Sequence, residues 1–86
     1  MMTVINIEKV EFDESKIGEK SSVDIQFIVN GHSGTAKVEI DKNLKLKAIY
    51  DFKIEKDNNN ELKNAGAMYF LARALQSRFQ TLAKNK

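Results

Sequence analysis

Apolar and polar residues alternate along the central part of the chain, as they do in strands that bury one face. Residues 22–30 (SVDIQFIVN) place an apolar side chain at every second position from Val23 to Val29. Residues 34–41 return with the same alternation. The connecting segment, NGHSG, begins with Asn-Gly, which is the strongest short-range signal for a hairpin. We therefore predict two antiparallel strands joined by a tight turn.

Two further stretches are also predicted to form strands. Residues 3–12 are rich in β-branched residues, but their alternation changes phase halfway, which predicts a bulge near Glu8 and Lys9. A second tight turn at 41–43 leads into residues 44–55, the longest predicted strand. Its predicted inward side chains are Leu44, Leu46, Ala48, Tyr50, Phe52 and Ile54.

The pattern changes to a helical period in residues 61–83. Asn60 is a suitable N-cap for this helix, and the chain contains no proline that would break it. Its apolar stripe repeats every three or four residues, with Leu62, Ala65 and Tyr69 on the flank. The stripe consists of Met68, Leu71, Ala72, Leu75, Phe79 and Leu82.

These elements predict an α+β fold: a four-stranded antiparallel β-meander followed by one long C-terminal helix packed on one sheet face. A chain of 86 residues with 42% hydrophobic and 30% charged residues suits a single domain over residues 1–86. A domain of this length buries a small core, and without cysteine it has neither disulfides nor thiolate metal ligands. Self-association is then a common way to bury more surface.

The predicted helix has a second set of apolar and small residues, on the side turned away from the sheet. Phe70 is the one large member, and the row continues in both directions at heptad spacing. Small residues allow another backbone to approach, while Phe70 can act as an anchor. The alternative is a single exposed phenylalanine among alanines that favour a helix. We expect a protein interface at Ala67, Phe70, Ala74, Ser77 and Thr81.

Known catalytic and metal-binding patterns do not match the chain. His32 is the only histidine and falls in the predicted turn, so it is expected to be a solvated turn residue. Gly31-His32-Ser33-Gly34 differs from a nucleophile elbow in spacing and in context. The carboxylates in loops stand beside lysines, where nothing desolvates them. We expect no catalysis, no cofactor and no metal.

Charge distribution leaves a nucleic-acid alternative open. The net charge is only +2, but residues 61–86 hold five basic residues and one glutamate, whereas residues 1–60 hold nine lysines and eleven acids. A sheet with exposed aromatic and basic side chains is a common surface for single-stranded nucleic acid. The candidate contacts are Lys45, Lys47, Lys53, Tyr50, Arg73 and Arg78.

The expected function follows from these patterns together. The N-terminal residues do not resemble a signal peptide, and no apolar run approaches the about 18 residues that span a membrane. We expect a non-catalytic cytoplasmic protein of bacterial or phage origin, acting as an oligomeric binding or adaptor module. Its partner is expected to be a second copy, most simply in a dimer, or another protein. The layout is also similar to that of SecB-type holdases, although no motif accompanies this similarity.

Overall fold

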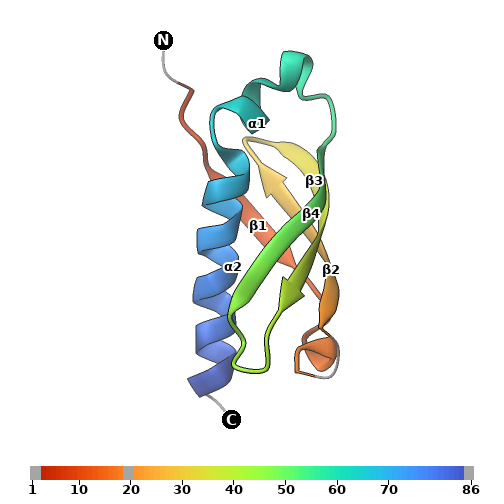
Figure 1. Cartoon of the computed structure of the whole chain (residues 1–86). Coiled ribbons are helices and arrows are strands. Elements are labelled where there is room, and N and C mark those ends of the chain that lie inside the picture. Colours follow the sequence, from red (N-terminus) through yellow and green to blue (C-terminus); the bar gives the residue numbers. More distant parts are fainter. Residues whose placement is uncertain (1–2, 19–20, 85–86) are drawn as a thin grey trace.

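Four antiparallel strands form one sheet in the order β1-β2-β3-β4, and a long C-terminal helix follows them (Figure 1). The computed structural model describes residues 3–18 and 21–84. The strands are β1 (Ile7–Glu11), β2 (Ser22–Val29), β3 (His32–Ile40) and β4 (Leu46–Ile54). The helical elements are η1 (Glu14–Lys16), η2 (Asn58–Asn60), α1 (Glu61–Asn64) and α2 (Ala67–Lys84). The predicted α+β meander is confirmed.

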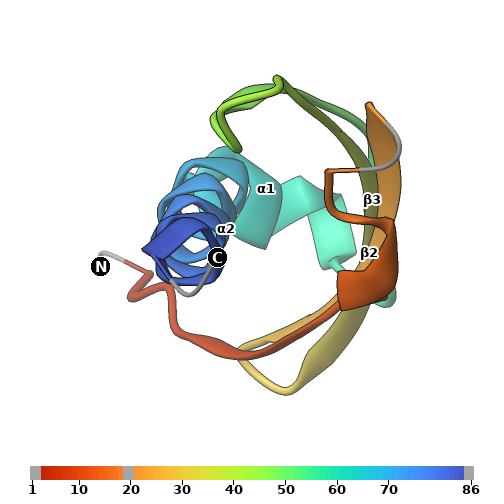
Figure 2. The ribbon, with the colours of Figure 1, turned by 90° about the horizontal axis from the view of Figure 1, so that it is seen from below.

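The sheet curls around α2, so that the helix lies across the opening between the two edge strands, β1 and β4 (Figure 2). The core fills the space between the helix and the concave side of the sheet. Phe79 of α2 packs edge to face against Phe12, with ring centroids 5.4 Å apart. The largest fully buried side chains are Phe79, Ile25, Leu71, Leu75, Val29 and Val38.

The hairpin between β2 and β3 uses only two residues. Asn30 and Gly31 have φ values of 49° and 81°, and a two-residue turn with two positive φ angles matches the twist of the flanking strands. The strand β3 therefore starts at His32, two residues earlier than predicted. The Asn30 side chain also accepts a hydrogen bond from the Asn6 amide (2.7 Å) and donates one to the Val4 carbonyl (2.8 Å). These bonds hold the N-terminal segment beside the hairpin.

Gly34 leaves room for the Phe27 ring on the core-facing side of the sheet. It pairs with Phe27 across β2 and β3, and a Cβ atom at Gly34 would collide with the Phe27 ring. The ring stacks in turn on Phe52 of β4, with centroids 5.4 Å apart. A glycine at this position thus allows Phe27 to join three strands in one contact.

The two edge strands contain bulges. In β1 the register shifts between Ile7 and Lys9, which confirms the predicted bulge. In β4 there are two shifts, opposite Glu39–Ile40 and opposite Thr35–Lys37. Asp51, with a φ of 53°, lies in the second shift.

The β4 bulges correct the predicted inward face of this strand. Each extra residue turns the following side chains to the other face of the sheet. As a result Ile49 packs against the core, although the alternation predicts it on the outside. Ala48 and Tyr50 are exposed, so their predicted inward orientation is wrong. Phe52 and Ile54 return to the core after the second bulge.

The turn between β3 and β4 depends on Asp41. Its Oδ1 atom accepts hydrogen bonds from the amides of Lys45 (2.9 Å) and Asn43 (2.8 Å). These bonds, with that of Lys45 the larger cause, lower the pKa of the Asp41 carboxyl below its usual value. Because the folded-state pKa is lowered, the carboxylate stabilises the fold above its unfolded-state pKa, and this contribution is lost as the pH falls through the folded-state value.

The predicted continuous helix over 61–83 is divided into α1 and α2. Gly66 has a φ of 99°, a left-handed conformation that interrupts the helical ladder. Asn60 occupies the predicted N-cap position of α1, but it has a φ of 55° and its side chain makes no capping bond. The carboxylate of Asp57 caps α1 instead. It accepts hydrogen bonds from the amides of Leu62 (2.8 Å) and Lys63 (3.1 Å).

We expect Asp57→Ala to lower the free energy of unfolding by about 1–2 kcal/mol, because two amides at the start of α1 lose their acceptor. Asn58→Ala is the matched control and should change stability by less than about 0.5 kcal/mol, as an exposed residue beside the cap. Urea denaturation of both variants measures the difference. Equal stabilities for the two variants would show that Asp57 does not hold the start of α1.

Candidate functional site

The solvent-facing side of α2 carries two adjacent exposed aromatic residues. Tyr69 has 61% of its surface exposed and Phe70 38%. Their rings meet edge to face with centroids 5.6 Å apart, and the Arg73 guanidinium lies 5.9 Å from the centroid of the Tyr69 ring. The rest of this side consists of small and polar residues, with one lysine at its end. We call the following set the outer surface of α2: Tyr69, Phe70, Arg73, Ala74, Ser77, Gln80, Thr81 and Lys84.

An open groove of about 390 Å³ runs between α2 and the edge strand β4, next to Tyr69. Most of its lining is apolar, and Lys47 provides the one charge. Gln76 lies further along the same seam, where its side chain accepts a hydrogen bond from the Leu46 amide (3.0 Å) and donates one to the Leu44 carbonyl (3.4 Å). The groove residues are Leu46, Lys47, Ala48, Ile49, Met68, Tyr69 and Ala72.

Four of the five residues predicted for a protein interface lie on the outer surface of α2. Phe70, Ser77 and Thr81 are exposed and Ala74 is half-buried. They follow one another at spacings of four, three and four residues. The Thr81 hydroxyl donates a hydrogen bond to the Ser77 carbonyl (3.1 Å), so its polar group is satisfied within the helix.

The fifth residue, Ala67, is fully buried, so its predicted place on the exposed row is wrong. Ala67 lies eleven residues before Arg78, which corresponds to about three turns and places both on one line along α2. Arg78 reaches β1, where its guanidinium donates to the Val10 carbonyl (3.0 Å) and lies 4.8 Å from the centroid of the Phe12 ring. Ala67 therefore starts the helix on the side that faces β1 and the core.

The structure divides the six candidate nucleic-acid contacts among different surfaces. Arg78 is directed toward β1 and also pairs with Glu14, at 3.4 Å. Arg73 lies on the outer surface of α2, and Lys47 lines the groove beside it. Lys45 ends the turn that Asp41 organises. This distribution does not form the single basic track that a nucleic-acid backbone follows.

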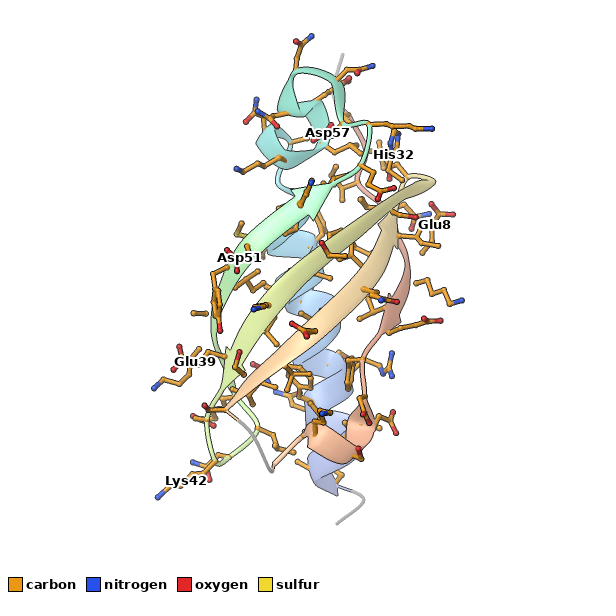
Figure 3. All side chains as sticks on the ribbon, turned by 90° about the vertical axis from the view of Figure 1, so that its right-hand side faces the viewer. Glu8, His32, Glu39, Lys42, Asp51 and Asp57 are labelled. Carbon is orange, nitrogen blue, oxygen red and sulfur yellow. The ribbon has the colours of Figure 1, made fainter. Side chains whose placement is uncertain are left out.

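The remaining two, Tyr50 and Lys53, belong to β4 and are exposed. Tyr50 is 41% exposed, and its hydroxyl lies 2.6 Å from that of Ser22 on the other side of β3. Acidic residues lie at the same face, among them Glu39 and Asp51 (Figure 3). The outer side of the sheet thus mixes both signs of charge around its one exposed tyrosine.

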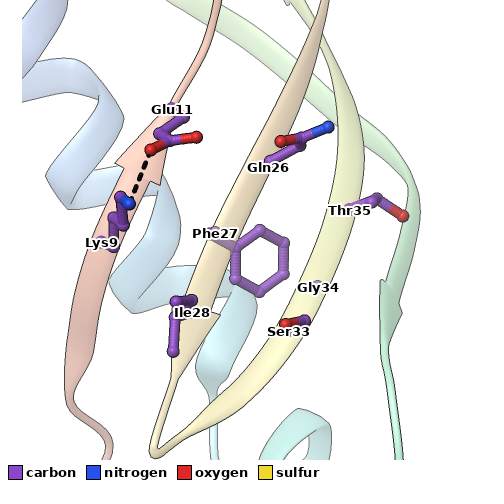
Figure 4. Close-up of a pocket in the computed structure, with 8 residues that line it drawn as sticks. All are labelled: Lys9, Glu11, Gln26, Phe27, Ile28, Ser33, Gly34 and Thr35. Carbon is purple, nitrogen blue, oxygen red and sulfur yellow. Dashed lines mark ion pairs between the residues drawn. The ribbon is translucent and has the colours of Figure 1, made fainter.

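A shallow hollow of about 300 Å³ lies on the outer side of the sheet (Figure 4). Lys9 and Glu11 form an ion pair of 2.8 Å at its margin, and Phe27 of β2 and Gly34 of β3 are among the residues that line it. The pair is largely exposed, and exposed ion pairs contribute little free energy. The hollow offers a ligand one neutralised charge pair and a few polar side chains.

His32 lies at the start of β3 rather than in a turn, which corrects its predicted position. Its Nδ1 atom is 3.0 Å from the Glu55 carbonyl oxygen, so the ring bridges the ends of β3 and β4. Asp57 lies at the same end of the molecule (Figure 3). Within residues 3–18 and 21–84, no group of three or more His, Cys, Asp and Glu side chains is placed to hold a metal ion.

Comparisons with protein-family models, with curated proteins and with solved structures gave no match to this chain. Among the helices that the structure describes, none is long and apolar enough to cross a membrane. Among the described residues, the exposed large apolar and aromatic side chains are Val4, Tyr50, Tyr69 and Phe70. Two of them, Tyr69 and Phe70, adjoin one another on the outer surface of α2.

Proposed function

We propose that the protein is a non-catalytic protein-binding module, and that its contact surface is the outer surface of α2. The observation that carries this proposal is the exposed pair Tyr69–Phe70, which lies beside an apolar groove. Exposed apolar side chains that adjoin one another on a small domain mark contact sites more often than isolated ones do. Activity in the cytoplasm, in a bacterial or phage setting, is part of the same proposal.

The chemistry of this surface supports binding to protein. Tyrosine, phenylalanine and arginine are enriched in protein interfaces, and Tyr69, Phe70 and Arg73 adjoin one another here. The positions after Phe70 along the row are small, which allows a second backbone to approach closely. An aromatic anchor next to small residues is the arrangement that concentrates binding energy in a few contacts.

Self-association remains a prediction from the sequence. The exposed side of one helix offers a small contact area compared with stable interfaces, which bury about 1,200–2,000 Å² in total. A dimer built on this surface alone is therefore expected to be weak. Light scattering across a range of protein concentrations measures whether it forms.

Site-specific photo-crosslinking in cells of the source organism tests the proposed contact surface. We expect a p-benzoylphenylalanine at position 70 to give adducts with protein of defined mass, because it replaces a ring at the centre of the surface. The same group at Thr35, an exposed residue of β3, is the matched control and should give few adducts. Tyr69→Asp should abolish the adducts from position 70 while the far-UV dichroism stays unchanged.

Two results would contradict the proposal. One is an equal yield of adducts from position 35 and position 70, which would place binding elsewhere or make it unspecific. The other is a lack of protein adducts from position 70 while the sheet position reacts, which would assign the contact to the outer side of the sheet.

A further inference from the structure

The outer surface of α2 is basic as well as apolar. The helix contains Arg73, Arg78 and Lys84 and no aspartate or glutamate. Arg78 is turned toward β1 and pairs with Glu14 of η1. Within the described part of the chain, Arg73 and Lys84 form no ion pair. The outer surface therefore presents two cations to a partner and no anion.

A third cation lies across the groove. Lys47 is an exposed residue of β4 and lines the groove together with Tyr69 and Ala72. Together Arg73, Lys84 and Lys47 border the aromatic pair and the small residues. A partner that covers the apolar stripe encounters this positive border, and carboxylates are its complement.

A second copy of the chain does not supply that complement at α2. In a two-fold pairing of α2 with itself, both copies bring only cations to the seam. Like charges placed together in this way oppose association, and no acidic side chain on α2 offsets them. The charge pattern favours a different chain over a second α2.

The shape of the surface indicates the conformation of this partner. The stripe from Phe70 to Thr81 covers eleven residue steps, which is about 16 Å along the helix axis. It is one helix face wide, and the groove toward β4 is open beside it. Such a strip is matched by an amphipathic helix of about three turns, which places apolar residues at every third or fourth position.

We propose that the outer surface of α2 binds an acidic amphipathic helical segment of another protein. The apolar residues of this segment cover Tyr69, Phe70 and the small residues that follow. Its carboxylates face Arg73, Lys84 and Lys47. This proposal rests on the proposed function and adds to it the chemistry of the partner.

A charge-swap experiment tests the proposal with two synthetic peptides. Each peptide has about 21 residues, with leucine at the apolar heptad positions. One carries glutamate at its exposed positions and the other carries lysine. We expect fluorescence anisotropy to show binding of the glutamate peptide to the wild-type protein and no binding of the lysine peptide.

The double variant Arg73→Glu/Lys84→Glu should reverse this preference. We expect it to bind the glutamate peptide at least about tenfold more weakly than the wild type and to gain affinity for the lysine peptide. Arg78→Gln is the control, because that side chain faces β1, and it should bind the glutamate peptide as the wild type does. A scrambled glutamate peptide without the apolar stripe should not bind.

Three outcomes would overturn the proposal. The first is that the glutamate peptide does not bind the wild type, and the second is that it binds the wild type and the double variant equally. The third is a dimer in light scattering that Phe70→Asp dissociates, which would assign the surface to a second copy. In each case, protein adducts from position 70 would still support the contact surface, so failure of the partner's chemistry is distinct from failure of the proposed function.

Discussion

Phe79→Ala is expected to lower the free energy of unfolding by about 3–5 kcal/mol, the range measured for truncation of a buried phenylalanine. Phe79 is fully buried and meets Phe12 edge to face, so it joins α2 to the segment that follows β1. A domain of 86 residues is stable by only about 4–13 kcal/mol. The substitution therefore removes a large share of the total, and the midpoint of urea denaturation should fall steeply.

Phe70→Ala is the matched control on the same helix. Its ring is 38% exposed and contributes less to the core, so we expect a loss of about 1 kcal/mol or less. Phe79→Leu keeps most of the buried volume and should cost about 1–1.5 kcal/mol, which gives a measurable variant if Phe79→Ala does not fold. Equal losses at positions 70 and 79 would contradict the assignment of the two faces of α2.

Gly34→Ala is expected to destabilise the fold by about 1–3 kcal/mol, because the new methyl group collides with the Phe27 ring. Neither residue can move freely, since Phe27 is buried and stacks on Phe52. Gly31→Ala provides a contrast within the same hairpin. Its Cβ atom would meet nothing, so any loss there comes from the positive φ angle alone.

A double-mutant cycle isolates the collision. Phe27→Leu removes the ring atoms that a Cβ at position 34 would meet, at its own cost in packing, and leaves the close approach of 2.8 Å to the Lys53 carbonyl oxygen. We therefore expect Gly34→Ala to cost less in the Phe27→Leu background than in the wild type, with a coupling of about 1 kcal/mol or more, and to keep part of its cost. Additive losses would show that the penalty at Gly34 does not arise from this ring.

The strands were predictable because one face of the sheet is buried. From Val23 to Val29 the alternation of the sequence is the alternation of burial in β2. The bulge in β1 was also predictable, since the phase of its apolar residues changes within the strand. In β4 the large apolar residues Leu46, Ile49 and Phe52 recur at every third position instead of every second, which is the signal of two bulges. A single continuous alternation fits more residues of this strand, so the sequence alone did not predict the two bulges.

The helix and its outer surface were predictable only in part. The apolar stripe of α2 is as expected, but Gly66 interrupts the helix and Ala67 is buried at the new start. A helical projection alone cannot show where the sheet ends, and hence which flank of the helix β1 covers. For the same reason the projection places Tyr69 at the flank of the core, whereas its side chain is largely exposed in the structure.

Binding of an acidic helix to the outer surface of α2 is tested most directly by an amide nitrogen–proton NMR titration of the protein with the glutamate peptide. We predict that the shifted resonances cluster in α2 from Tyr69 to Lys84 and in β4 around Lys47, and that the shifts weaken as salt is added. Shifts concentrated on the outer side of β2 and β3, or no shifts at low salt, would contradict the claim.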